Sequence, residues 1–384
     1  MAKIIISYTV PLTFCFSDET IKKLKEAGHE VLLMSSNENE LKAVADGLGI
    51  GYKFIGFQRS MNLFADIKSI CCLAKYFKQA KPDLLIGATP KASMISMIAG
   101  KIAHVPIRVY HIFGFPFETA KGFFRKVLIG IERLTAMCAT NVLPISHSIG
   151  EVAIAKKMVK KEKLHQTNAL TIGGVDTERF NPATVDCSAL KVQHNCKDDE
   201  IIVGFVGRLT TDKGLFDYME VVDKLSNKYQ NLRCLIIGGN DERCPVDKKQ
   251  FDDFVAKHNV IYVEHTNDIP EYMRLMDIFL QPSYREGFGN ANVEAESMCV
   301  PVVCYDVTGC KDSISNGKSG YCVPFKDIDG LCEAMSKLIE DVALRKRMGE
   351  YGRKFVEENY SREKVALFNR KYFTRLLKLK LHTK

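Results

Sequence analysis

The sequence predicts an α/β protein with two doubly wound parallel sheets. Short apolar, β-branched runs alternate with amphipathic helical patterns along the whole chain, which is typical of parallel α/β folds. The pattern begins afresh near residue 200, after a charged and weakly periodic stretch from Pro182 to Glu200. The 384 residues, 46% hydrophobic and 26% charged, suffice for two cores. We therefore expect domains over residues 1–180 and 181–360, followed by a basic helix over 361–384.

The expected strands form one set in each domain. Those of the first domain are Lys3–Ser7, Glu30–Ser35, Asp83–Gly87, Ile107–Tyr110 and Asn141–Ile145. Those of the second are Ile201–Val206, Leu232–Ile237, Val260–Val263, Ile278–Gln281, Pro301–Cys304 and Tyr321–Val323. The tail helix either packs back onto the first domain or forms a solvated basic end. Doubly wound sheets bind ligands outside the carboxyl ends of their strands, so the site is expected in a cleft between the domains.

Charge is unevenly distributed along the chain. Residues 51–163 carry 18 Lys and Arg against 6 Asp and Glu, whereas residues 181–360 carry 22 against 30. A basic first half is suited to an anionic partner, either nucleic acid or an anionic membrane surface. The basic half shows no recognisable nucleic-acid-binding module, and the acidic second half opposes such binding, so we expect no nucleic-acid partner.

The expected location and metal content depend on three sequence features: membrane-spanning segments, a signal peptide and the spacing of cysteines. The uncharged stretch over residues 136–150 is interrupted by polar side chains and is too short to cross a bilayer. The N-terminus enters a strand-like run without a signal-peptide pattern, which favours a cytoplasmic protein. The 13 cysteines lie mostly in apolar runs, including Cys71 and Cys72, and form no C-x-x-C pair. We expect buried thiols and no structural metal.

The first informative motif runs from Gly204 to Gly214, between a strand and a helix. Glycines at a strand end let a ligand approach the backbone, and the following helix N-terminus favours an anion. Arg208 and Lys213 add two cationic donors, so the segment suits a diphosphate. The alternative is an ordinary turn with two solvated cations.

The second motif carries two carboxylates, Glu286 and Glu294, around the next glycine-bearing loop. A helix is expected to begin near Asn290, which places Glu294 in its first turn, where its carboxylate can reach a ribose diol. Backbone amides of Gly287, Phe288, Gly289 and Asn290 would face the ligand. Glu294 alone could simply complement the helix dipole; the pair of carboxylates favours a binding site.

At these motifs the sequence resembles the retaining GT-B glycosyltransferases of family four, which have two Rossmann-like domains facing a central cleft. The G-R-x(4)-K-G segment is met by Gly207, Arg208, Lys213 and Gly214, and the E-x(7)-E segment by Glu286 and Glu294. Further matches are Ile145–Ser148, Gly174–Pro182, Asp277 and Gly309–Asp312. The chain looks most like members that build bacterial capsule, O-antigen and lipid-linked oligosaccharides.

The resemblance implies a role for each matching residue. Gly207, Arg208 and Lys213 would bind the donor diphosphate, Glu294 would hold the ribose, and Glu286 would lie near the hydroxyls of the transferred sugar. His111 is similar to the family histidine that contacts the sugar from the first domain; a satisfied histidine at a strand end is the alternative. The chain departs from the family pattern in the first loop, residues 7–13, which lacks a glycine pair, and at Gly173–Gly174, where an asparagine commonly precedes the glycine.

The expected activity is transfer of a hexose or N-acetylhexosamine from a nucleotide sugar, with UDP as the expected nucleotide by resemblance, onto a glycan or polyprenyl-diphosphate-linked saccharide. We expect retention, no metal and no cofactor besides the donor substrate. Residues Lys121–Leu134 form a basic amphipathic pattern, which indicates either core packing or peripheral contact with the anionic inner face of the plasma membrane. The alternative functions are a UDP-sugar 2-epimerase of the same architecture and a non-catalytic nucleotide-sugar-binding protein.

Overall fold

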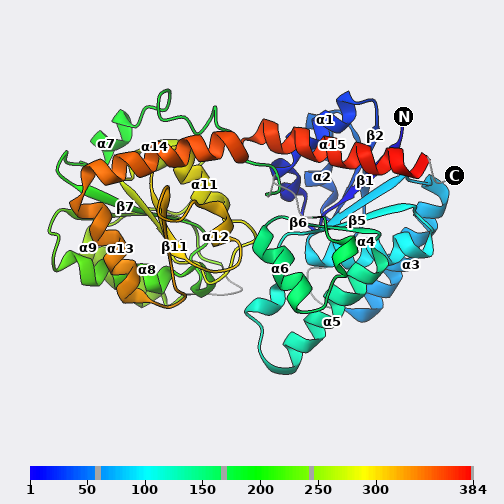
Figure 1. Ribbon diagram of the computed structural model, residues 1–384, viewed down its shortest axis with the longest axis horizontal. Helices are drawn as coiled ribbons and strands as arrows, with labels where there is room; N and C mark the ends of the chain where they lie inside the picture. The colour runs from blue at the N-terminus through cyan, green and yellow to red at the C-terminus, as the bar shows by residue number, and fades with distance from the viewer. Residues whose placement is uncertain (57–61, 166–170, 242–245, 382–384) are drawn as a thin grey trace. The chain divides into compact units, whose positions relative to one another are not determined.

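The computed structural model describes residues 1–56, 62–165, 171–241 and 246–381. The chain divides into two compact units (Figure 1). Unit 1 comprises Met1–Gly174 together with Arg362–Lys384, and unit 2 comprises Val175–Ser361. The division falls after Gly174, where the sequence pattern placed it at residue 180, and the tail helix belongs to unit 1.

Unit 1 contains a six-stranded sheet in the order β3-β2-β1-β4-β5-β6, and every neighbouring pair is parallel. The strands are β1 (Lys3–Ser7), β2 (Glu30–Ser35), β3 (Gly51–Phe54), β4 (Leu84–Ala88), β5 (Ile107–Ile112) and β6 (Asn141–Pro144). Five of these strands were expected from the sequence. The edge strand β3 was missed because none of its four residues is buried, so it lacks an apolar run.

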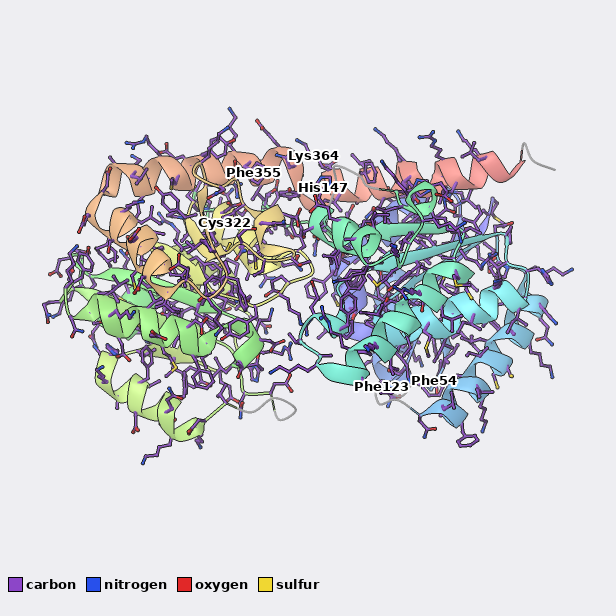
Figure 2. The ribbon with its side chains drawn as sticks, turned by 60° about the horizontal axis from the view of Figure 1, so that its bottom comes forward. Phe54, Phe123, His147, Cys322, Phe355 and Lys364 are labelled. Atoms are coloured by element: carbon purple, nitrogen blue, oxygen red, sulfur yellow. The ribbon has the colours of Figure 1, made fainter. Side chains whose placement is uncertain are left out.

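Helices cover both faces of this sheet. They are η1 (Pro11–Phe16), α1 (Asp18–Glu26), α2 (Glu38–Leu48), α3 (Leu63–Ala80), α4 (Pro90–Ile102), η2 (Pro116–Glu118), α5 (Gly122–Cys138), α6 (His147–Ala155), η3 (Lys161–Lys163) and α15 (Arg362–Leu381). On one face α1, α2 and α15 share a core with the strands, to which the tail helix contributes Phe373 and Leu377. On the other face α3, α4 and α5 pack side by side. Phe54 at the end of β3 and Phe123 at the start of α5 lie along one edge of this unit (Figure 2).

Unit 2 contains a second six-stranded parallel sheet, in the order β12-β11-β10-β7-β8-β9. Its strands are β7 (Ile201–Val206), β8 (Leu232–Ile237), β9 (Ile261–Val263), β10 (Ile278–Gln281), β11 (Val302–Tyr305) and β12 (Gly320–Val323). Its helices are α7 (Ser188–Gln193), η4 (Thr211–Lys213), α8 (Leu215–Ser226), α9 (Lys248–His258), α10 (Ile269–Leu275), α11 (Asn290–Ser297), α12 (Cys310–Ser313), α13 (Ile328–Glu340) and α14 (Val342–Asn359). All six expected strands are present, and two doubly wound parallel sheets confirm the predicted fold class.

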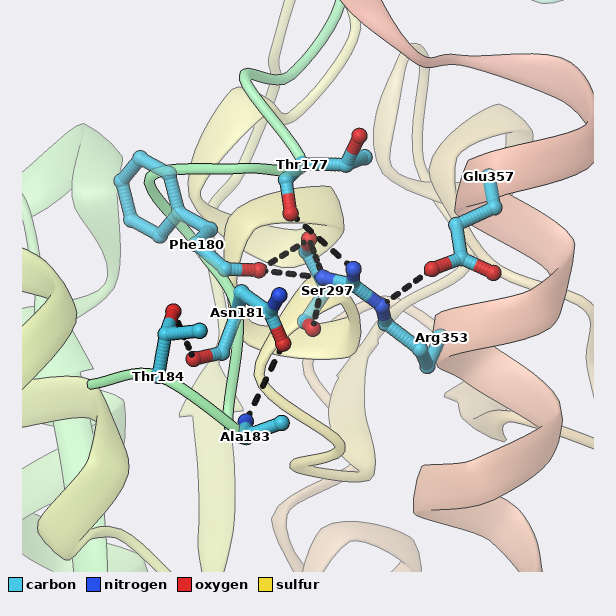
Figure 3. Close-up of polar contacts among 8 residues, drawn as sticks. All are labelled: Thr177, Phe180, Asn181, Ala183, Thr184, Ser297, Arg353 and Glu357. Atoms are coloured by element: carbon cyan, nitrogen blue, oxygen red, sulfur yellow. Dashed lines mark hydrogen bonds and ion pairs between the residues drawn. The ribbon is translucent and has the colours of Figure 1, made fainter.

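The first segment of unit 2 is held by Arg353 of α14 (Figure 3). The guanidinium donates to the carbonyl oxygens of Phe180, of Thr177 at 3.0 Å and of Ser297 at 2.9 Å, and it forms an ion pair with Glu357 at 2.6 Å. One planar guanidinium therefore joins the entry segment, α11 and α14, because its donors point in several fixed directions.

Two expectations about single residues change with the structure. Cys71 and Cys72 are exposed on α3 rather than buried, because they lie on the outer side of an amphipathic helix. Cys138, Cys234, Cys304 and Cys310 are buried thiols, as expected. Across residues 1–56, 62–165, 171–241 and 246–381, no helix is both long and apolar enough to cross a membrane.

Candidate active site

Arg208 and Lys213 lie in the connection that follows the central strand β7 of unit 2. The turn is fixed to the neighbouring strand end, because the amides of Gly207 and Leu209 donate to the carbonyls of Ile237 and Gly239, each at 2.9 Å. Gly214 ends the turn with φ +77°, and a Cβ there would overlap the carbonyl oxygen of Pro282 at the end of β10. Glycine is therefore required for the turn to pack against the next strand end.

Lys213 and Glu286, one from each predicted motif, form an ion pair. Lys213 Nζ lies 2.5 Å from Glu286 Oε1, and both side chains are mostly buried. The Ser283 hydroxyl donates to the same Glu286 oxygen at 2.9 Å, and the Gln281 amide donates to the Ser283 hydroxyl at 2.9 Å. This chain of donors orients the carboxylate before any ligand arrives, and charge-assisted bonds of this kind are the stronger ones.

Arg208 pairs with a residue that the sequence analysis did not name. Its Nη1 donates to Oδ2 of Asp241, whose side chain is buried while that of Arg208 is half exposed. Asp241 follows Gly238 and Gly239 at the carboxyl end of β8, the strand next to β7. That position was the available signal, because carboxyl ends of neighbouring parallel strands meet at one edge of the sheet.

Glu294 lies on α11, which begins at Asn290 as expected. It is the fifth residue of the helix and so stands in the second turn, not in the first turn where the sequence pattern placed it. Burial raises the pKa of Glu294 to about 7, and the nearby positive charge of Arg179 lowers it in part. A carboxyl group whose pKa is shifted this far towards neutral pH is typical of a functional site.

The glycine-bearing loop before α11 holds the remaining predicted residues. Gly289 caps α11 with φ +86°, and a Cβ there would come 2.9 Å from the Ser313 hydroxyl. The Phe288 ring is buried and packs edge-on against Tyr360, with ring centroids 4.9 Å apart. Its side chain is therefore part of the core, whereas Gly287 and Asn290 are partly exposed. The Phe288 side chain is therefore not available to a ligand, and the contacts expected from the sequence are those of the main chain.

A buried carboxylate behind the site, Asp217 of α8, was also missed. It accepts hydrogen bonds from the Tyr305 hydroxyl at 2.7 Å and the Tyr284 hydroxyl at 2.9 Å, and lies 3.1 Å from Lys326 Nζ. The Lys326 ammonium also lies 4.0 Å from the centre of the Tyr284 ring. Because Tyr284 stands two residues before Glu286, this cluster anchors the loop that carries the Glu286 carboxylate. A single Asp in a helix gives no sequence signal for such a role.

His111, the predicted residue of the first domain, lies at the carboxyl end of β5 in unit 1. It is buried, and burial lowers its pKa to about 3, so the imidazole is neutral. Its ring meets Phe113 edge-on at 4.8 Å. In register it stands between Ala88 of β4 and Leu143 of β6. A neutral histidine at this edge can donate one hydrogen bond from one ring nitrogen and accept one at the other.

A hydroxyl cluster lies at the carboxyl ends of β1 and β4 in the same unit. Thr9 Oγ1 and Thr89 Oγ1 are 2.7 Å apart, and the amide of Ala92 in the first turn of α4 donates to Thr9 Oγ1 at 3.2 Å. Thr89 adopts φ +66°, an uncommon backbone conformation for a residue with a Cβ. The first loop thus contributes the Thr9 hydroxyl to a cluster at this edge of the sheet.

The arrangement in unit 2 provides two cations, each paired with an anion, at the edge where parallel sheets bind ligands. Such groups can bind a diphosphate once it replaces the internal carboxylate partners. No group of three or more His, Cys, Asp or Glu side chains within the described part of the chain is placed to hold a metal ion.

Comparisons with known proteins match each of the two units to a glycosyltransferase family model. Residues 188–355 match the family described as "Glycosyl transferases group 1", and residues 3–146 match "Glycosyl transferase 4-like". Together these matches cover the strands of both sheets, from β1 to β12, and include Arg208, Glu286 and His111.

Individual similar proteins are also glycosyltransferases. The chain is 32% identical to a capsular polysaccharide biosynthesis glycosyltransferase, CapM, of Staphylococcus aureus, over 89% of this chain and 88% of the relative. It is 27% identical to an N,N'-diacetylbacillosaminyl-diphospho-undecaprenol alpha-1,3-N-acetylgalactosaminyltransferase of Campylobacter jejuni, over 88% of this chain and 90% of the relative. The fold matches that of Anabaena HepE, crystallised with UDP-glucose, with a TM-score of 0.78 at 16% identity over 98% of this chain and 100% of that one. The chain therefore belongs to the GT-B glycosyltransferases of family four.

Proposed function

We propose that this glycosyltransferase moves a sugar from a UDP-sugar onto a polyprenyl-diphosphate-linked saccharide during synthesis of a surface polysaccharide. The observation that carries the proposal is the pair of oriented cations, Arg208 and Lys213, at the carboxyl edge of the unit 2 sheet. Two relatives support the acceptor class by their names, one a capsular polysaccharide enzyme and one acting on a diphospho-undecaprenol saccharide. HepE, which shares the fold, supports UDP as the nucleotide.

The chemistry asks mainly for stabilisation of a leaving anion. The bond between the anomeric carbon and the donor phosphate oxygen breaks, and the electron pair leaves on the nucleoside diphosphate. Arg208 and Lys213 would neutralise that developing charge without a metal ion, and groups oriented in advance are the most effective for this purpose. The acceptor hydroxyl then bonds to the anomeric carbon on the same face. Its proton passes to the departing phosphate, and the configuration is retained because the new bond forms on the face from which the nucleoside diphosphate leaves.

The other predicted residues would hold the donor. The Glu294 carboxylate would accept hydrogen bonds from the ribose diol, and the main chain from Gly287 to Asn290 would face the phosphates. Glu286 would bind hydroxyls of the transferred sugar, a hexose or N-acetylhexosamine, because the Lys213 ammonium and the Ser283 hydroxyl already fix its orientation. His111 would contact the sugar as a neutral hydrogen-bonding group, since its pKa of about 3 excludes a charged imidazole near neutral pH.

The same proposal includes peripheral contact with the anionic inner face of the plasma membrane. An acceptor on a polyprenyl chain is confined to the bilayer, so the enzyme must work at its surface. The excess of cations over residues 51–163 supports electrostatic attraction to anionic lipids.

The central test is the Arg208→Ala variant. Loss of one donor to the leaving charge is expected to lower turnover by about two to three orders of magnitude, with a much smaller change in the acceptor KM. Arg347→Ala, at an exposed position of α14, is the matched control and should keep normal turnover. Normal turnover in Arg208→Ala would refute the assignment, and inactivation of the wild-type enzyme by EDTA would refute metal independence.

A separate measurement distinguishes the alternatives. Incubation with the nucleotide sugar alone should yield no epimerised free sugar, whereas a 2-epimerase would release one without an acceptor. The donor itself can be identified from thermal unfolding with UDP-, GDP-, ADP- and dTDP-sugars, because a ligand that binds only the native state raises its melting temperature.

A further inference from the structure

The topology of unit 1 brings the starts of three helices to one edge. Each of α3, α4 and α5 follows one strand of the parallel sheet and precedes the next, so each begins at the carboxyl edge. The three helices pack side by side with α4 in the middle. The beginnings of α3 and α5 therefore flank the beginning of α4 on the same edge of the unit.

Large apolar side chains are exposed along this edge. At the start of α3, Leu63 is 72% exposed, Phe64 85% and Ile67 50%. At the start of α5, Phe123 is 81% exposed and Phe124 53%. Phe54, which ends β3, is also exposed and lies on the same edge as Phe123 (Figure 2). Contiguous apolar groups on a surface indicate an interaction site, whereas single ones do not.

The exposed charged side chains from residue 62 to residue 131 are all cationic. Lys53, Lys68, Lys121, Arg125 and Lys126 are exposed next to the apolar residues. The acidic residues from 62 to 131 are Asp66, Asp83 and Glu118, and none of the three is in the exposed class. Asp66 is moreover paired with Lys91 of α4 at 2.6 Å. Apolar tips surrounded by cations complement the surface of an anionic bilayer, and large exposed aromatics are the usual inserting groups there.

A pocket lies beside the same tips, between the end of β3 and α3. It has a volume of about 440 Å³ and is lined by apolar and aromatic side chains, including Phe54, Leu73 and Tyr76, with Lys53 and Lys68 among its polar groups. Lys53 Nζ lies 5.6 Å from the centre of the Tyr76 ring. An apolar pocket that includes two ammonium groups suits a lipid chain whose phosphate remains at the surface.

We propose that the starts of α3 and α5 form a membrane-inserting edge that binds an anionic lipid bilayer. The inference rests on the proposed function in that the acceptor would lie in the same bilayer. It goes further by naming the residues that insert into the bilayer. The edge carries two apolar prongs, Leu63–Ile67 and Phe123–Phe124, so binding combines attraction to anionic headgroups with burial of aromatic side chains.

A tryptophan reporter tests insertion directly, because the chain contains no Trp. Phe64→Trp places a single indole on the first prong, and Ile102→Trp places one at the end of α4, on the opposite edge of the same helix layer. Phosphatidylcholine vesicles with phosphatidylglycerol and brominated acyl chains should blue-shift and quench the emission at position 64 and leave that at position 102 unchanged. Equal responses at the two positions, or no quenching at position 64, would overturn the proposal.

A matched pair of isoleucines measures the contribution to affinity. Ile67 and Ile102 are 50% and 48% exposed on neighbouring helices but lie at opposite edges. Ile67→Glu combined with Phe123→Glu should weaken binding to anionic vesicles at least about tenfold, since two buried apolar groups are lost and two charges enter the lipid surface. Ile102→Glu should bind like the wild type. Equal affinities for both variants would contradict insertion, and unchanged thermal unfolding would show that both remain folded.

Activity separates this proposal from the proposed function. The double variant should lose transfer to a vesicle-embedded acceptor relative to transfer to a short-chain, water-soluble acceptor, while Ile102→Glu should keep the wild-type ratio. A wild-type enzyme that transfers to neither acceptor would refute the proposed function and leave the vesicle result intact. An enzyme that transfers to both acceptors equally in all variants would refute the membrane-inserting edge alone.

Discussion

Donor binding is expected to depend on pH through a single carboxyl group, Glu294. Burial raises the pKa of this group to about 7, with Arg179 lowering it in part. A ribose diol needs an acceptor for both of its hydroxyl protons, and an ionised carboxylate supplies two acceptor oxygens where the protonated acid supplies one good acceptor and a donor. The donor should therefore bind the ionised form, and its affinity should fall as the pH falls through 7.

The expected change in donor affinity with pH follows from the pKa of Glu294. If only the ionised form binds, the apparent Kd is the intrinsic Kd divided by the ionised fraction. With a pKa of about 7, that fraction falls roughly tenfold between pH 8 and pH 6, which is about 1.4 kcal/mol of binding free energy.

Isothermal titration calorimetry at pH 6, 7 and 8 measures the effect. The ligand should be a nucleotide sugar and not UDP, because a terminal phosphate titrates near pH 6 and would obscure the protein group. Glu294→Gln should bind more weakly at pH 8 and show little change with pH. Burial also raises the pKa of Glu132 in unit 1 to about 7, so Glu132→Gln is the matched control and should keep the wild-type slope. A flat wild-type profile, or a slope that survives in Glu294→Gln, would refute the assignment of Glu294 to the ribose.

Further predictions concern the stability of unit 2. Gly214→Ala should lower the free energy of unfolding in urea by at least about 2 kcal/mol, because it adds a steric overlap to left-handed backbone strain. Gly317 has nearly the same φ and open space around the Cβ position, so Gly317→Ala should lower it by about 1 kcal/mol. Equal losses in the two variants would exclude the overlap. Burial raises the pKa of Glu296 well above its ordinary value of 4.5, so its contribution to stability is present below about pH 4.5 and is lost as the pH rises towards the folded pKa, by up to about 1.4 kcal/mol per pH unit. In Glu296→Gln, thermal stability should change less between about pH 5 and about pH 8 than it does in the wild type. An unchanged dependence of thermal stability on pH would contradict this prediction. Arg353→Met should destabilise unit 2 by about 3 kcal/mol, since several buried carbonyls lose their donor, whereas the neighbouring Lys354→Met should be nearly neutral by the same unfolding measurement.

The sequence was sufficient for most of the fold because buried parallel strands require continuous apolar runs. Ile201–Val206 and Leu232–Ile237 are such runs, and the structure has strands at both positions. The edge strand β3 has no buried residue, so only its pairing with β2 defines it. Glu294 stands one turn further into α11 than expected. Cys71 and Cys72 proved exposed, because an apolar stretch of sequence does not reveal which side of a helix faces the core.

In the candidate site too, some residues could be named from the sequence and others only from the structure. Sequence motifs alone named Arg208, Lys213, Glu286 and Glu294, because glycines at strand ends and cations before a helix are local features. Their partners depend on strand order: β7 lies between β10 and β8, which brings Glu286 to Lys213 and Asp241 to Arg208 across 73 and 33 residues of sequence. The residue types and their spacing thus indicated the family, which the comparisons confirm, and the ligand chemistry that we propose. Only the tertiary structure decided which carboxylate orients each cation and which edge of unit 1 exposes its aromatic side chains, because both depend on elements that are distant in the chain and adjacent in space.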